Sequence, residues 1–453
     1  MSKRKSKVKN WFNSNKVNIF LAILLFSISF FIRFQYQKID EVPTLRGDQQ
    51  KYITIANNFH NYRVYSVDSS YPPQYGSEIR PGYPLYLSTF FDGTKVDFQE
   101  IFTNQAVLGS LTVLFTFLTA LLFLSRKAAF IVGILVAINP HLIALEGLLL
   151  TENTFIPLLS AGVFFICYGQ VKNNHFSTLI GGLSLAIATY TRVVNIFMIP
   201  LFIAIFIYEF WKSPKKDKKN RIKMKKSIIT LIFAWCTIYM GNQIIVLTNT
   251  PPVEVVAVEE SEQTYNSIPG YLLSVLDYSL IPPIFFVEKK PGILSTATTS
   301  KEARYLKRES ELSFFEAPWI YIRWISYGKL RTLWSFKQGY SGSVHINAPL
   351  TDPFETNQFY KITHNTMKVL HWPLFILSLL GIAIYCYQIL TSKLAIKQSK
   401  LKYIIVGFTF TLLGLVFVGW LPRYSIPLRP LSYIIAIYAS TEIYKHVKKR
   451  FQG

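Results

Sequence analysis

Long apolar segments recur along this 453-residue chain. Each runs for about 18 residues or more, which is enough to cross roughly 30 Å of hydrocarbon as a helix. The apolar positions are continuous rather than alternating, and helices satisfy their own backbone hydrogen bonds within lipid. The pattern predicts an all-α polytopic membrane protein with about ten transmembrane helices (range 9–12). The expected spans are residues 17–37, 101–124, 128–145, 152–170, 176–191, 193–211, 227–248, 367–390, 403–420 and 425–444.

The composition agrees with this fold class, and the charge adds an orientation. Hydrophobic residues make up 51% of the chain and the mean hydropathy is +0.28. The formal net charge is +23, and 26 of the 48 Lys and Arg residues fall on one side of the expected spans, mostly near the ends of the chain and in the loop 212–226. Basic residues beside spans remain in the cytoplasm. We therefore expect a multi-pass protein of the cytoplasmic (plasma) membrane with both termini in the cytoplasm, and no nucleic-acid partner.

Two long loops connect the spans on the opposite, extracytoplasmic side. They cover residues 38–100 and 249–366. We expect three regions: an N-terminal transmembrane module, 1–248, which includes the first outer loop; the second outer loop; and C-terminal transmembrane helices, 367–453.

Both outer loops contain segments with helical patterns. The apolar residues between Tyr52 and Phe59 predict an amphipathic helix, whereas the Pro- and Tyr-rich stretch 71–86 predicts irregular backbone and turns. In the second loop, Thr299–Glu302 resembles a capping box that opens a helix. Residues 317–336 combine Trp with Arg and Lys, a composition typical of a helix lying in the membrane interface.

The cytoplasmic side offers no room for nucleotide chemistry. No expected cytoplasmic segment exceeds about sixteen residues, which is too short for a nucleotide-binding domain. The chain also lacks a GxxxxGK[ST] motif and a GxGxxG motif that opens a helix. Any group transfer must therefore use the outer loops, where a lipid-linked donor is the natural source of an activated group.

Ionisable residues gather at the outer ends of the expected spans. Such groups are costly at membrane depth, roughly 2.5–3.5 kcal/mol, and tend to be functional. Each one alone is more often a solvated loop charge or a membrane anchor, but together they predict one cavity at the outer face. The set is Asp48, Arg80, Glu146, Glu152, Arg192, Arg423 and Arg429.

Several of these residues stand in short motifs that keep a fixed order along the chain. In that order the motifs resemble those of GT-C membrane glycosyltransferases of the protein O-mannosyltransferase and aminoarabinose-transferase (family 39-like) group. The resemblance covers most of the chain. The motifs are Asp48 followed by Tyr52, Arg80 before Pro81-Gly82-Tyr83-Pro84, Thr151-Glu152, Thr191-Arg192, and Arg423-Tyr424 followed by Pro427.

The resemblance implies roles for the residues that match. Asp48 is the expected catalytic base, although Gln49 replaces the second acid of the family's acidic pair. Arg80 is expected to contact the donor phosphate, together with Arg192 and Arg423. Glu152 is the second expected catalytic residue, with three roles open: it orients the acceptor, supports the base or binds a divalent ion.

A wider set of residues is expected to line the substrate pocket. They are Gln49, Tyr52, Tyr83, Glu146 and Tyr424. No metal-binding residue is assigned, because His364 and His371 lack a third ligand and Gln49 removes a carboxylate pair. No cofactor is assigned either, and the need for a divalent cation stays open.

The function expected from this reasoning is an inverting glycosyltransferase. It moves a sugar from a polyprenyl-phosphate donor in the membrane to an acceptor at the outer face, and the acceptor is a glycan, a lipid or a protein. Two alternatives remain: an envelope polysaccharide polymerase or ligase, and a lipid or solute transporter or flippase.

Overall fold

The computed structural model describes most of the helical part of the chain. The described residues are 2–36, 45, 47–70, 73, 79–192, 196–214, 217–249, 318–336, 353–391, 400–418 and 422–452. They divide into two compact units. The first consists of Met1–Val253, Val344–Thr409 and Pro427–Gly453, and the second of Glu254–Ser343 and Phe410–Ile426.

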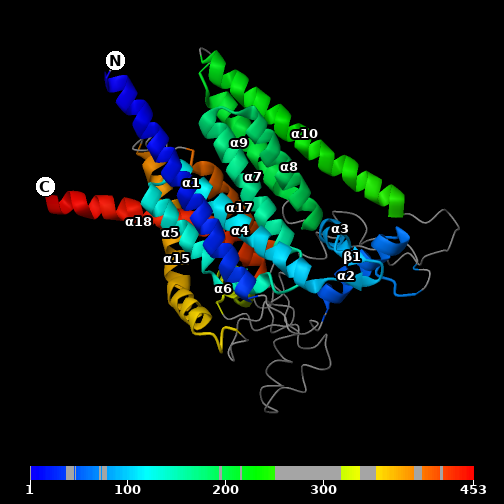
Figure 1. Ribbon diagram of the computed structural model, residues 1–453. Coiled ribbons are helices and arrows are strands. Elements are labelled where there is room, and N and C mark those ends of the chain that lie inside the picture. Colours follow the sequence, from blue (N-terminus) through cyan, green and yellow to red (C-terminus); the bar gives the residue numbers. More distant parts are fainter. Residues whose placement is uncertain are drawn as a thin grey trace. The chain divides into compact units, whose positions relative to one another are not determined.

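The first unit is a bundle of long helices, as the hydrophobic pattern predicts. Figure 1 shows α7 and α8 side by side, with α10 running along α8 and α9. Its helices overlap the expected spans, and some extend well beyond them. They are α1 (Ser2–Tyr36), α4 (Phe98–Phe123), α5 (Arg126–Ala137), α6 (Pro140–Leu145), α7 (Glu152–Lys172), α8 (His175–Thr191), α9 (Met198–Lys212), α10 (Lys218–Asn249), α15 (Gln358–Leu390) and α18 (Arg429–Gln452), while α17 (Lys402–Val418) runs from this unit into the second.

Four helices of the described residues are both long and apolar enough to cross a membrane. They are Lys16–Tyr36, Phe98–Phe123, Glu152–Lys172 and Gln358–Leu390, and Lys402–Val416 is a shorter apolar helix. The helical class is confirmed, whereas the number of about ten spans stays a prediction.

One expected span is wrong as a single helix. Residues 128–145 form two helices, because α5 ends at Ala137 and α6 begins at Pro140. The Asn139 side chain caps α6, accepting hydrogen bonds from the backbone nitrogens of His141 (3.0 Å) and Leu142 (3.1 Å). Pro140 occupies the first helical position, where its missing N–H costs nothing. This local chemistry breaks an otherwise continuous apolar run.

The first outer loop folds onto the bundle as two helices and a hairpin. The predicted amphipathic helix is confirmed as α2 (Asp48–Tyr62). The prediction of irregular backbone is wrong for the end of 71–86, where α3 (Gly82–Ser88) forms; Pro84 lies in its first turn, where the N–H groups have no helical partner. The antiparallel strands β1 (Phe91–Asp92) and β2 (Lys95–Val96) follow.

These elements share a small apolar core with the start of α4. Its buried members are Ala56, Tyr83, Leu87, Phe91, Ile101, Phe102 and Leu149. The core therefore joins the first outer loop to the segment that precedes α7.

The second unit contains the predicted helix at 317–336. It is helical from Pro318 to Leu333, as α13 (Pro318–Arg323), the π-helical turn η5 (Trp324–Gly328) and α14 (Lys329–Leu333). Its position in the membrane interface stays a prediction. Within this unit, Lys329 Nζ donates a hydrogen bond to the Val416 carbonyl at 2.7 Å. The capping box at Thr299–Glu302 lies outside the described residues.

Candidate functional site

The amino end of α7 carries a buried carboxylate held by an arginine. Glu152 is 1% exposed and forms an ion pair with Arg192. The Thr151 hydroxyl donates to Glu152 Oε2 at 3.1 Å and accepts from Arg192 Nη1 at 3.4 Å. Two motifs that lie about 40 residues apart in the sequence, Thr151-Glu152 and Thr191-Arg192, therefore form one cluster.

Close packing of α7 against α8 brings these two motifs together. Arg192 is the extended residue that follows the end of α8. A Cβ atom on Gly162 would lie 2.6 Å from Leu185 Cδ2, and one on Gly181 would lie 2.8 Å from the Gly162 carbonyl oxygen. Small residues at a helix contact let the two backbones approach closely. The antiparallel pair consequently places the start of α7 beside the end of α8.

The segment that carries Arg80 packs against the same end of α8. A Cβ atom on Gly82 would lie 2.7 Å from Thr191 Cγ2 and 2.8 Å from the Tyr190 carbonyl carbon, so only glycine fits this approach. Arg80 is half-buried and lies two residues before this contact. The first outer loop therefore delivers a second arginine to the region around Arg192.

The segment that carries Asp48 is fixed to the loop before Glu152. Gln49 Oε1 accepts a hydrogen bond from the Leu149 backbone nitrogen at 3.1 Å, across 100 residues of sequence. Asp48 is half-buried in the first turn of α2. Where the family motif has a second acid, Gln49 thus makes a structural contact that orients the first turn of α2.

Tyr52 and Tyr83, both expected in the substrate pocket, lie against each other. Their rings meet edge to face with centroids 5.4 Å apart, and Tyr83 is fully buried. The structure brings together these two tyrosines, Gln49 and the Thr151–Arg192 cluster through one set of packed elements.

Sequence reasoning missed two amides that connect these elements. Gln105 Oε1 accepts from the Tyr83 hydroxyl at 2.7 Å and from Asn153 Nδ2 at 2.9 Å, while Gln105 Nε2 donates to the Glu146 carbonyl at 2.7 Å. Asn153 Nδ2 also donates to the Leu148 carbonyl at 2.6 Å. Buried polar side chains in apolar helices require such partners. The sequence did offer a signal for these two residues, because Gln105 and Asn153 are polar side chains inside apolar segments.

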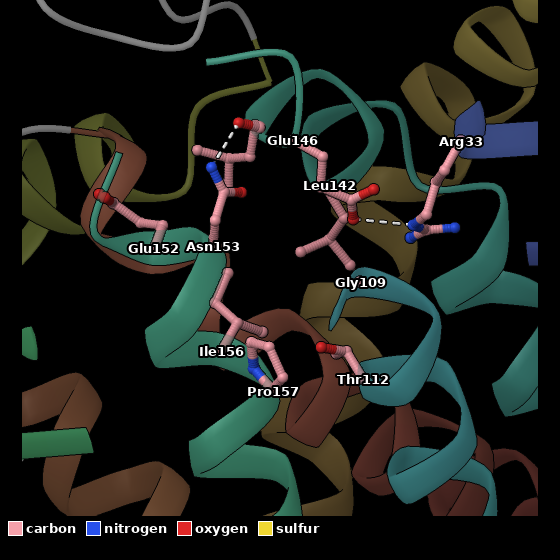
Figure 2. A pocket seen from close by; sticks show the side chains of 10 residues that line it. Arg33, Gly109, Thr112, Leu142, Glu146, Glu152, Asn153, Ile156 and Pro157 are labelled. Atoms are coloured by element: carbon pink, nitrogen blue, oxygen red, sulfur yellow. Dashed lines mark hydrogen bonds and ion pairs between the residues drawn. The ribbon is translucent and has the colours of Figure 1, made fainter. Parts of the chain in front are cut away.

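Glu146 makes a buried ion pair with a residue that sequence reasoning also missed. Arg33 Nε lies 2.8 Å from Glu146 Oε1, and Arg33 Nη1 donates to Ser29 Oγ at 2.7 Å and to the Ala137 carbonyl at 3.0 Å. Figure 2 shows this pair beside Gly109, which has no side chain to displace it. The role of Glu146 in a substrate pocket stays a prediction.

A small pocket separates this pair from Glu152. In Figure 2, Arg33 and Glu146 line one side, and Glu152 and Asn153 line the other. Burial raises the pKa of the Glu146 carboxyl to about 8, against the opposing effect of the Arg33 guanidinium. The pocket is thus lined by polar side chains of α1, the α6–α7 connection and α7, and by apolar side chains of α6 and α7.

The remaining expectations concern Arg423, Tyr424 and the histidines. Arg423 and Tyr424 belong to the second unit, and their place in the site stays a prediction. Among the described residues, no group of three or more His, Cys, Asp or Glu side chains could hold a metal ion. His371 instead packs near His141, with ring centroids 6.1 Å apart.

Comparison with known proteins finds a family similarity in the central helices. Residues 95–254 match the family model described as dolichyl-phosphate-mannose-protein mannosyltransferase. The match to this glycosyltransferase family covers 160 of the 453 residues. The predicted resemblance to GT-C enzymes is thereby confirmed. No curated protein matches the chain significantly.

Solved oligosaccharyltransferase structures share the fold. An Archaeoglobus fulgidus oligosaccharyltransferase, tethered with an acceptor peptide, aligns with a TM-score of 0.53 and 14% identity over 95% of this chain and 50% of its own. AglB from the same organism, in complex with an inhibitory peptide and a dolichol-phosphate, aligns with a TM-score of 0.50 and 12% identity over 97% of this chain and 52% of its own. ArnT from Cupriavidus metallidurans, bound to undecaprenyl phosphate, aligns with a TM-score of 0.39 and 12% identity over 93% of this chain and 77% of its own. The chain spans about half the length of the oligosaccharyltransferases.

Proposed function

We propose that this protein is an inverting glycosyltransferase that takes its sugar from a polyprenyl-phosphate lipid. The observation that carries the proposal is the convergence at Glu152: its ion pair with Arg192, and the Gln49 contact that ties the Asp48 segment to the same loop. The matched family uses dolichyl-phosphate-mannose by its description, and AglB was solved with a dolichol-phosphate. Both support a lipid-phosphate donor.

The chemistry needs a base and a cationic phosphate holder. The acceptor hydroxyl or amine attacks the anomeric carbon with its lone pair and transfers its proton to the Asp48 carboxylate. The bond from the anomeric carbon to the phosphate oxygen breaks, and its electrons leave with the lipid phosphate. General-base help of this kind contributes roughly 10²–10⁴-fold. A single displacement without a covalent intermediate inverts the anomeric centre.

Arginines stabilise the charge that develops on the departing phosphate. Guanidinium groups offer paired donors to phosphate oxygens, and these hydrogen bonds strengthen as negative charge grows. In this proposal Arg80 and Arg192 do so. Glu152 holds the Arg192 guanidinium through its ion pair, which supports an orienting role for Glu152.

The proposal includes the topology and domain division expected from the sequence. The reaction takes place at the outer face of the cytoplasmic membrane, on the side of the loops 38–100 and 249–366. The donor sugar and the acceptor, whether glycan, lipid or protein, remain to be identified by experiment.

A donor panel tests the function directly. Purified protein would be incubated with labelled polyprenyl-phosphate sugars that differ in the sugar, together with candidate acceptors, and the release of polyprenyl phosphate would be followed. We expect at least one lipid-linked donor to be consumed. Consumption of a nucleotide sugar, with every lipid-linked donor left intact, would overturn the proposal.

A further inference from the structure

Arg429 is a buried arginine whose guanidinium forms no hydrogen bond with any described residue. It begins α18 and is 0% exposed, and its Nε, Nη1 and Nη2 atoms form no hydrogen bond with the part of the chain that the structure describes. Arg33 provides the contrast: it is equally buried, but bonds to Glu146, Ser29 and the Ala137 carbonyl. Burial alone therefore does not explain why Arg429 forms no hydrogen bond with the described residues.

A hydroxyl group with a proton to donate lies one helical turn further along. Tyr433 is buried on the same helix, and residues four apart share a helix face. Asn139 Nδ2 donates a hydrogen bond to the Tyr433 hydroxyl oxygen at 2.6 Å. Because Asn139 supplies the proton of that bond, the hydroxyl keeps its own proton for another acceptor.

An enclosed guanidinium without an anion is energetically unfavourable. Buried charges in proteins are paired, and an intramembrane ionisable residue marks a site for a ligand or an ion. Among the described residues, no carboxylate pairs with Arg429. The missing partner is an anion.

We propose that Arg429 and Tyr433 bind the phosphate group of a polyprenyl-phosphate lipid. The planar donors of a guanidinium match two oxygens of a phosphate, and the tyrosine hydroxyl supplies a third donor. Arg429 stands at the expected outer end of the last span, the depth at which lipid phosphates lie. The choice of a polyprenyl phosphate over other phosphates rests on the proposed function.

Thermal stability of the purified protein in detergent tests this site. Wild type, Arg429→Met and Arg429→Lys would be heated without ligand, with polyprenyl phosphate, with the phosphate-free polyprenol and with inorganic phosphate. Polyprenyl phosphate should raise the wild-type Tm, and the other two additions should leave it unchanged. Arg429→Met should match or exceed the wild-type Tm without ligand, since it removes an unpaired charge, and should lose the lipid-induced shift. Arg429→Lys keeps the charge but not the paired donors, and should weaken apparent affinity at least tenfold.

Arg33→Met is the matched control, because it removes a buried arginine that has partners. It should lower the Tm without ligand and keep the shift with polyprenyl phosphate. The inference is overturned if Arg429→Met keeps the shift, or if it lowers the ligand-free Tm as much as Arg33→Met does. An equal shift with polyprenol or with inorganic phosphate would also overturn it.

A further variant separates this inference from the proposed function. Asp48→Asn should lower the rate of sugar transfer by roughly 10²–10⁴-fold but keep the Tm shift with polyprenyl phosphate, because Asp48 acts on the acceptor. If wild type shows the shift and consumes no lipid-linked donor, the proposed function fails while the phosphate site stands. If donors are consumed and Arg429→Met binds polyprenyl phosphate as wild type does, the phosphate site fails alone.

Discussion

Replacing Gly109 with alanine tests whether the Arg33–Glu146 pair holds the loop before α7. A Cβ atom at position 109 would lie 1.8 Å from Glu146 Oε1 and 2.8 Å from Arg33 Nε, so the carboxylate must move. Breaking a buried ion pair costs about 3–5 kcal/mol. Alanine regains about 1 kcal/mol over glycine inside a helix. The expected net loss is about 2–4 kcal/mol of unfolding free energy.

Equilibrium unfolding in mixed detergent micelles would measure this loss. Gly414→Ala is the matched control, since no atom lies within 4 Å of the added methyl group and the site is also inside a helix. The control should be as stable as wild type or more stable by up to about 1 kcal/mol. If Gly109→Ala unfolds at the same detergent composition as the Gly414→Ala control, the ion pair does not hold the loop and the reasoning fails.

Three further predictions address the site and the topology. Glu152→Gln removes the charge from the ion pair with Arg192 and should lower kcat roughly 10–100-fold, as expected for a hydrogen bond to a charged group; an unchanged kcat would remove Glu152 from the site. Gln49→Ala leaves the Leu149 N–H without its acceptor, and it should cost about 1–3 kcal/mol of unfolding free energy and lower kcat. Gln49→Glu can still accept this hydrogen bond and should recover much of the stability. A cysteine at exposed Asp92 should react with a membrane-impermeant maleimide in intact cells, whereas one at Lys218 should react only after permeabilisation; the reverse pattern would place the first long loop in the cytoplasm.

The helices of the bundle could be predicted from the sequence because their signal is local. An apolar run long enough to cross a bilayer fixes a helix without reference to its neighbours, so α4 and α7 begin and end within a few residues of expectation. The break at Asn139 escaped the pattern because both halves are apolar. Its signal was capping chemistry, an Asn-Pro step, rather than hydropathy.

The contacts that build the site could not be predicted, because their partners lie far apart in sequence. Gln105 and Arg33 are conspicuous as polar residues inside apolar helices, which indicates that each needs a partner. Which partner they find depends on helix packing, and no pattern within α1 or α4 identifies Glu146 or Asn153. The motif residues Glu152 and Arg192 were singled out separately, but their ion pair appears only once α7 packs against α8.

Transfer by wild type, Asp48→Asn and Asp92→Asn, measured side by side with the same labelled polyprenyl-phosphate donor, tests the central claim most directly. Both substitutions remove one carboxylate charge from the first outer loop, but Asp92 is exposed in the hairpin and has no proposed role. We expect Asp48→Asn to lower the transfer rate by roughly 10²–10⁴-fold and Asp92→Asn to leave it unchanged. Full transfer by Asp48→Asn, or an equal loss in both variants, would contradict the account.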